Sequence, residues 1–159
     1  MGIKNIVVSV AGGVVSLLTA KYAVYLAQQL DAKLTAVYVV DEKALGDLLK
    51  SKIFVEVEAQ GYESDLEEQG RRFLERVRRM AEQKGVAFEP VLTRGVVHDE
   101  VVETIKQLNA DMLVMGELKE AVSRKEIFYD EGERIFRESP CTVVVVKDYE
   151  KVEMLYGSI

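Results

Sequence analysis

Short apolar runs alternate with helical patterns along most of the chain. Five runs are rich in Val, Ile and Leu, as expected for parallel strands that are covered on both faces. They occupy residues 3–10, 34–40, 87–93, 112–115 and 141–146. Pro90 lies inside the third run, where its missing N–H favours a sheet edge or a strand start. The pattern therefore predicts five strands.

Between these runs, apolar residues recur every three or four positions, which is the spacing of one helix face. Ser16 is a candidate N-cap for the first helix, and Asp31 marks its end. Further helices are predicted at about residues 99–108 and 130–138, because both segments carry the same periodicity.

The region from residue 41 to residue 64 is the hardest to assign. Residues 44–49 favour a short helix, whereas residues 53–57 alternate as a strand does and also fit the edge of a helix. Beyond this region, Ser64 with Glu67 three residues later has the pattern of a capping box. We therefore expect a long helix to begin at Ser64.

Strands and helices in alternation predict an α/β fold: a five-stranded parallel doubly wound sheet with helices on both faces. A chain of 159 residues is expected to form one domain, which we place at 1–147, followed by a C-terminal tail at 148–159. The tail is expected to be partly loose, although residues 152–156 include apolar side chains suited to docking. Ligands of such sheets bind outside the carboxyl ends of strands, which directs attention to the loop after Gly116.

The chain is acidic, with a net charge of −6. It therefore lacks the general basic footprint of a nucleic-acid-binding protein. The single cysteine, Cys141, excludes an internal disulfide and fits a reducing compartment. No stretch approaches the roughly 20 apolar residues of a membrane span, and the first residues form a strand pattern instead of a signal peptide. We expect a cytoplasmic protein without membrane insertion.

Arginines gather in the long central helix, which is also rich in glutamate. They are Arg71, Arg72, Arg76, Arg78 and Arg79. Interleaved charges of both signs favour a solvated face over an anion-binding patch.

Candidate catalytic and metal-binding side chains are few. His98, at the start of a helix, is expected to be a surface or capping residue, and Cys141, which opens an apolar strand, a buried structural thiol. One histidine and one cysteine cannot supply a zinc site, and the acidic residues show no calcium-loop spacing. We therefore expect no catalytic residue, no metal and no cofactor, and a protein that is not an enzyme.

Several stretches, in order, resemble one known family. Asn5–Val10 (NIVVSV) is similar to the family's first strand, usually ILVPVDGS, and residues 37–41 (VYVVD) to its LHVVD. Residues 111–116 (DMLVMG) are close to DLIVMG, and residues 133–146 (ERIFRESPCTVVVV) resemble ERVLRHAPCPVLVV. Over residues 3–147 the chain thus resembles a universal stress protein domain, whose sheet is Rossmann-like and similar to that of the adenine nucleotide alpha hydrolases.

Members of this family that bind ATP carry a loop of the form G-x-x-G-x9-G-S/T after the fourth strand. Glycine is needed there because the backbone approaches phosphates closely and turns its N–H groups inward. Here Gly116 matches the first position, whereas Lys119, Tyr129 and Asp130 stand at the other three. Ala11 stands where the family has a first-strand aspartate that contacts the nucleotide. The resemblance therefore implies a member that lacks the ATP-binding glycine loop and has a degenerate nucleotide site.

Two interpretations of the altered loop at residues 117–129 stay open. In one it is a solvated connection, in which Lys119, Arg124 and Lys125 face water. In the other these cations replace glycine amides as phosphate partners or bind another anion. Acidic residues argue against a strongly positive pocket: Glu117, Glu120, Glu126 and Asp130. By position in the family's nucleotide crevice, the candidate binding residues are Val10, Ala11, Val39, Met115, Gly116, Lys119, Tyr129 and Asp130.

The resemblance implies a stress-response protein that acts through homodimerisation or an unknown protein partner, without binding ATP. The family commonly dimerises through its last strand, which here contains Thr142, Val143, Val144, Val145 and Val146. An apolar strand at a sheet edge needs a cover, and a symmetry mate would supply one. The alternative is a nucleotide- or small-anion-binding domain that uses the altered loop at 116–130, with or without weak hydrolase activity. A third is a regulatory domain that binds a membrane transporter, as some members do.

Overall fold

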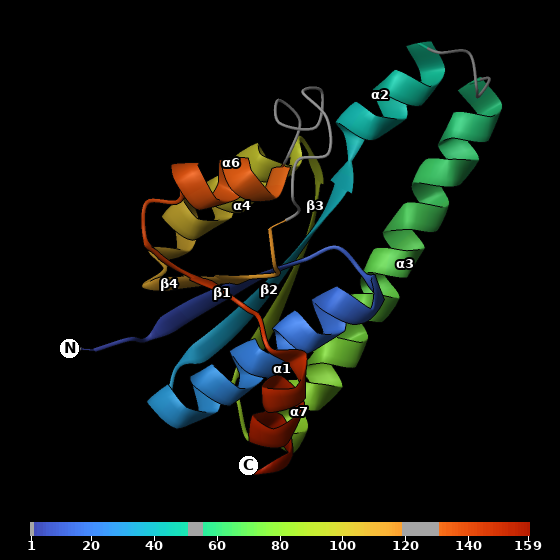
Figure 1. Ribbon diagram of the computed structural model, residues 1–159. Helices are drawn as coiled ribbons and strands as arrows, with labels where there is room; N and C mark the ends of the chain where they lie inside the picture. The colour runs from blue at the N-terminus through green and yellow to red at the C-terminus, as the bar shows by residue number, and fades with distance from the viewer. Residues whose placement is uncertain (1, 51–55, 119–130) are drawn as a thin grey trace.

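The computed structural model describes residues 2–50, 56–118 and 131–159, and strands and helices alternate along it (Figure 1). The strands are β1 (Asn5–Val10), β2 (Lys33–Asp41), β3 (Phe88–Gly95), β4 (Met112–Met115) and β5 (Thr142–Val145). The helices are α1 (Gly13–Leu30), α2 (Glu42–Lys50), α3 (Glu56–Gln83), α4 (Val97–Leu108), α6 (Glu131–Glu138) and α7 (Tyr149–Gly157).

The five strands form one sheet in the order β3-β2-β1-β4-β5. All four pairs of neighbours are parallel, and Val8 of β1 lies between Ala36 of β2 and Val114 of β4. This is the doubly wound parallel sheet that the sequence predicts. The predicted edge position of Pro90 is also confirmed, because β3 is one of the two outer strands.

The core lies on both faces of the sheet, since successive side chains of a strand point to opposite faces. One face packs against α1, α3 and α7, and its buried residues include Val8, Leu34 and Val77. The other face packs against α4 and α6 and includes Val7 and Leu113. Figure 1 shows the two groups of helices on opposite sides of the strands.

The first helix starts earlier than the sequence predicts. Its first residue is Gly13, and Gly12 is the N-cap with a φ of 87°, which favours glycine. Ser16 is therefore inside the helix, and its hydroxyl oxygen accepts a hydrogen bond from the backbone N–H of Ala11 at 2.9 Å. The helix ends as predicted at Asp31, whose left-handed conformation is tolerated by aspartate.

The long helix α3 also starts earlier than predicted. It begins at Glu56, so Ser64 and Glu67 lie inside it and form no cap. The cause is that residues 56–63 contain good helix formers and no proline, so nothing in them stops the helix. The short helix predicted before it is confirmed as α2, while residues 53–55 lie outside the described part of the chain.

The tail is not loose, which corrects the expectation from its mixed composition. Asp148 is the N-cap of α7, and its side chain accepts a hydrogen bond from the backbone N–H of Lys151. Val152 is only 2% exposed, in the core shared with α1 and α3. An ion pair at 2.8 Å between Lys21 and Glu153 also joins α7 to α1. The predicted docking is therefore shown for Val152 and Tyr156, whereas Met154 is 73% exposed.

Candidate functional site

The carboxyl ends of β1 and β4 form the point at which the chain departs in opposite directions. The two strands are neighbours, but α1, which follows β1, covers one face, and α6, which follows β4, covers the other. In doubly wound sheets, ligands bind outside the carboxyl ends of the strands at such a point, which we call the candidate crevice. Val10, Ala11, Met115 and Gly116 lie here, and Val39 lies near the carboxyl end of the neighbouring strand β2.

Most of these residues can offer a ligand only their backbone. Val10 and Met115 are each 4% exposed, and their side chains belong to the core on opposite faces of the sheet. Val39 is half-buried on the same face as Met115. Ala11 is exposed, but its methyl group cannot make a polar contact. Specific recognition at this edge therefore depends on backbone groups or on other side chains.

Gly116 has a packing role that is independent of any ligand. A Cβ atom at this position would lie 3.2 Å from Oγ1 of Thr19 and 3.3 Å from Cγ1 of Val15. Both neighbours belong to α1, so the start of this helix approaches the end of β4 closely. The glycine is therefore explained in part by close packing of helix on strand.

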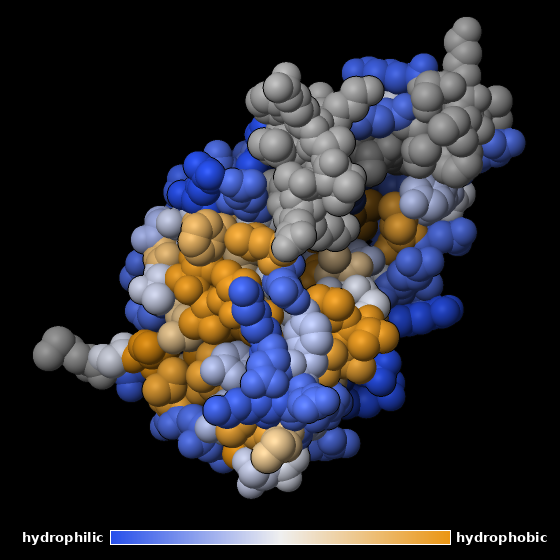
Figure 2. Space-filling model, viewed as in Figure 1, coloured by the Kyte–Doolittle hydropathy of each residue, from blue (hydrophilic) through white to orange (hydrophobic). Residues whose placement is uncertain are grey.

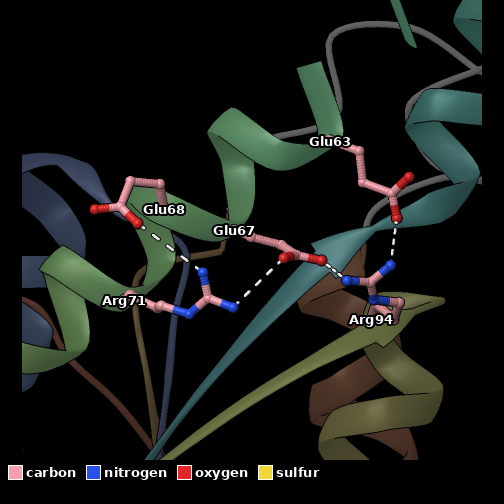
Figure 3. A network of polar contacts seen from close by, with 5 residues as sticks. All are labelled: Glu63, Glu67, Glu68, Arg71 and Arg94. Atoms are coloured by element: carbon pink, nitrogen blue, oxygen red, sulfur yellow. Dashed lines mark hydrogen bonds and ion pairs between the residues drawn. The ribbon is translucent and has the colours of Figure 1, made fainter. Parts of the chain in front are cut away.

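The described groups at this edge do not create a positive pocket. Arg94, near the end of β3, forms ion pairs with both Glu63 and Glu67 of α3, as Figure 3 shows. Its charge is thus neutralised by two carboxylates. Glu117 directly follows Gly116 and accepts a hydrogen bond from the hydroxyl of Tyr149. An acidic side chain therefore stands beside the backbone of the crevice.

The hydroxyl group of Tyr38 lies close to the turn between β1 and α1. A Cβ atom at Gly12 would lie 3.8 Å from the Tyr38 hydroxyl oxygen. Burial, with a smaller effect of Tyr62, raises the pKa of Tyr38 above its ordinary value. The phenol therefore stays neutral at physiological pH and adds no charge to the crevice.

The remaining loop positions lie outside the described residues. These are Lys119, Arg124, Lys125, Tyr129 and Asp130. The loss of the phosphate-binding glycines, and the choice between a solvated loop and an anion site, therefore stay predictions from the sequence. The arginine-rich helix is described: Arg71, Arg72, Arg78 and Arg79 each pair with glutamates of α3, which confirms a solvated charged face.

The predicted dimerisation strand is at the edge of the sheet. In the described part of the chain, β5 has β4 as its one neighbouring strand. Thr142 is exposed, Val143 to Val145 are half-buried, and Val146 is buried. The edge position is thus confirmed, whereas the dimer stays a prediction. Cys141, at the start of this strand, is half-buried, which corrects the expectation of a buried thiol.

A polar cluster around His98 was missed by sequence reasoning, which predicted a surface or capping residue. The histidine is buried between α4 and α6, and its Nδ1 lies 2.6 Å from Oε2 of Glu131. Its Nε2 faces carboxylates of Asp99 and Glu138. The available signal was spacing: Glu131 and Glu138 are seven residues apart, so they share one helix face. Nothing in the sequence states that this face meets α4.

Comparison with known proteins identifies the family. The model of the universal stress protein family matches residues 2–147. The chain belongs to the universal stress protein family. The universal stress protein MJ0531 of Methanocaldococcus jannaschii is 33% identical over 152 residues, which cover 93% of this chain and 84% of that protein.

Solved structures of universal stress proteins share the fold. One, in complex with cAMP, has a TM-score of 0.66 and 20% identity, and the match covers 92% of this chain and 98% of that one. Another, from Archaeoglobus fulgidus in complex with dAMP, has a TM-score of 0.59 and 14% identity, and covers 92% and 100%. In the described residues of this universal stress protein, no helix has the length and apolar character needed to cross a membrane.

Proposed function

We propose that this universal stress protein acts in the stress response as a homodimer or with a protein partner that pairs with β5, and that it does not bind ATP. The observation that carries the proposal is the contrast between the two edges of the sheet. On this proposal the protein is not an enzyme and acts in the cytoplasm, where its lone thiol stays reduced.

The β3 edge is protected against pairing, whereas the β5 edge is not. Strand β3 contains Pro90, which has no N–H to offer, and the charged residues Glu89 and Arg94. Natural sheets use prolines and charges in this way to block edge-to-edge association. Strand β5 (TVVV) has neither. Figure 2 shows apolar surface on the side of the molecule along which β5 runs.

A two-fold axis beside β5 would pair the strand with its own copy in antiparallel orientation. The backbone N–H of Val146 donates to the carbonyl oxygen of Met115 at 2.9 Å, so it points toward β4. Because N–H groups alternate in direction along a strand, the N–H of Val145 points away from β4 and is available to a partner. The interface would then be isologous, with one continuous sheet across both copies.

The residues at the candidate crevice support the proposal that the protein does not bind ATP. An alanine methyl group stands at position 11, Val14 and Val15 are exposed in the first turn of α1, and Glu117 follows Gly116. A triphosphate needs inward N–H groups or cations, and the side chains at these four positions are apolar or acidic. Isothermal titration of nucleotide-free protein with ATP and Mg²⁺ is expected to give no heat of binding.

The dimer is tested by Val145→Pro, which removes the outward N–H and leaves the ladder to β4 intact. Analytical ultracentrifugation of the wild type is expected to show a reversible dimer, and the variant should dissociate at least about tenfold more readily, equivalent to about 1.4 kcal/mol. The matched control is Val145→Thr, which keeps the N–H and the β-branched shape. A monomeric wild type, or equal dimerisation of folded Val145→Pro, would reject pairing through β5.

A second candidate function is the binding of a nucleoside monophosphate. It is favoured by the two solved relatives in complex with cAMP and dAMP, which share this fold. Backbone groups at Val10, Val39 and Gly116 are at the crevice where such a ligand would lie, and Lys119 would replace glycine amides as a phosphate partner. Titration with AMP and cAMP tests it: saturable binding that Lys119→Ala weakens would support this function and the altered-loop interpretation.

A further inference from the structure

The polar cluster between α4 and α6 has a defined arrangement around His98. The side chain of this histidine is 9% exposed. One oxygen of Glu131, Oε2, accepts the backbone N–H of His98 at 2.8 Å and lies 2.6 Å from its Nδ1. Both contacts need a donor from His98, because a carboxylate only accepts. The arrangement therefore places a proton on Nδ1.

With the proton on Nδ1, a neutral ring directs the lone pair of Nε2 toward two further acceptors. Oδ1 of Asp99 lies 3.2 Å from Nε2, and Oε2 of Glu138 lies 3.8 Å from it. Both of these neighbours are acceptors, because a carboxylate only accepts. A lone pair that faces two carboxylates is repelled by them unless a cation lies between the three groups. The cation is either a second proton on the ring or a metal ion.

We propose that His98, Asp99 and Glu138 form a binding site for a divalent metal ion of the zinc type. Their three ligand atoms all lie within 4.8 Å of one another. Imidazole nitrogen combined with carboxylate oxygen suits zinc and the neighbouring transition metals, whereas magnesium and calcium take oxygen ligands. Glu131 contacts the other ring nitrogen of His98, Nδ1. A carboxylate in that place fixes the tautomer of a metal-binding histidine and orients its ring.

The surroundings leave room for water to complete the coordination. Asp99 and Glu138 line a surface hollow of about 540 Å³, together with Val102, Glu103 and Lys106. Three protein ligands and one or more waters are the arrangement of an open metal site. The charge of Lys106 opposes the metal, and that of Glu103 favours it, so these two neighbours roughly offset each other.

The site would join α6 to α4. Asp99 belongs to α4 and Glu138 to the last position of α6, so one ion would bridge the two helices. Ile135 is the buried residue that the described part of α6 contributes to the core. A metal bridge would therefore add to a weak apolar attachment and stabilise the folded protein by linkage.

The experiment is a titration of the full, untagged and chelator-treated protein with Zn²⁺, with Co²⁺ absorption as the spectroscopic readout. The test variant is Glu138→Gln, since Glu138 is 52% exposed and its replacement is not expected to unfold the protein. The matched control is Glu103→Gln, which removes the same charge from the same hollow without touching His98.

The expected result is one saturable site per chain, a rise in melting temperature with Zn²⁺ and a nitrogen–oxygen Co²⁺ spectrum. Glu138→Gln should weaken binding by at least about tenfold, and Glu103→Gln by much less. Absence of saturable binding up to about 1 mM would reject the site. Equal binding by the wild type and Glu138→Gln would also reject it.

Discussion

The two faces of the sheet are built by different means. In the described residues, nineteen buried residues form the core on the face of α1, α3 and α7, against seven on the face of α4 and α6. The larger core is apolar and includes the C-terminal helix. The smaller one is supplemented by the cluster of His98 with three carboxylates, which joins its two helices.

This difference indicates where most of the apolar stabilisation is concentrated. Apolar burial contributes about 25 cal/mol per Å² without regard to direction, so the larger face can hold the fold together by area alone. The smaller face relies more on directed polar contacts, which hold specific groups in place but give less net stability each. We therefore expect specific chemistry on the smaller face. Because the apolar core of this face is thinner, the face should also tolerate a bound ligand or a shift of one of its helices more easily.

The strongest test of the contrast is a pair of large-to-small substitutions, Leu74→Ala in α3 and Ile105→Ala in α4. The side chains of Leu74 and Ile105 are 4% and 1% exposed, so each substitution should lower the free energy of unfolding by about 2–5 kcal/mol. We expect Leu74→Ala to lower the free energy of unfolding by at least about 1 kcal/mol more than Ile105→Ala does. The densely packed larger face should not close the cavity that Leu74→Ala leaves, whereas α4 should shift into the cavity that Ile105→Ala leaves. Chemical denaturation with a common m-value measures both.

The control for this pair is Met154→Ala on α7, whose side chain is 73% exposed. It should change the unfolding free energy by less than about 0.5 kcal/mol. If Ile105→Ala were as costly as Leu74→Ala, the two faces would be equally rigid and the contrast between them would be wrong.

The fold was predictable from the sequence because each strand contains a short run rich in apolar residues and most helices show a helical period. The errors lie where local signals compete. Ser64 and Glu67 have the pattern of a cap, yet the helix formers before them continue α3 to Glu56. The tail has a mixed composition of polar and apolar residues, but Val152 packs into the core, and this contact stabilises α7. Such long-range packing is invisible in a local pattern.

The site was less predictable than the fold. The crevice residues Val10 and Gly116 follow from the topology, because strand ends in a parallel sheet meet at one edge. The cluster of His98 with Glu131 and Glu138 unites two helices separated along the chain, so it depends on how α4 and α6 pack. A single sequence contains no information on that packing beyond helix periodicity.

A second pair of variants compares the packed and projecting parts of α3. Figure 1 shows this helix extending past the sheet beside α2. A Cβ at Gly70 would lie 2.8 Å from the Tyr38 ring and 2.9 Å from Leu92, whereas one at Gly61 meets nothing within 4 Å. Gly70→Ala should therefore destabilise by about 1–2 kcal/mol, as the clash exceeds the helix-propensity gain, and Gly61→Ala should stabilise by about 0.5–1 kcal/mol. Thermal unfolding measures both, and a stabilised Gly70→Ala would show that this packing has slack.

The smallest expected effect concerns the sheet that both faces share. Asp111, just before β4, accepts hydrogen bonds from the backbone N–H groups of Lys4 and Asn5 at 2.8 and 2.9 Å, and thereby joins β4 to the start of β1. These bonds lower the pKa of Asp111 below its ordinary value of 3.8. The folded state therefore gains stability from the ionised carboxylate above pH 3.8, and loses it as the pH falls through the lower folded value.

Asp111→Asn tests this, because an amide oxygen keeps both hydrogen bonds but has no charge. The wild type should be more stable than the variant at neutral pH, and the gap should close as the pH falls below 3.8. Denaturation at several pH values measures the gap, with Asp31→Asn as a control that removes a charge at the left-handed end of α1. A gap that is constant with pH would mean that the charge contributes nothing and that the backbone hydrogen bonds alone join the two strands. Both faces of the sheet pack on β1 and β4, so protonation of Asp111 in acid should destabilise both faces together. The difference in unfolding free energy between Leu74→Ala and Ile105→Ala should therefore stay unchanged.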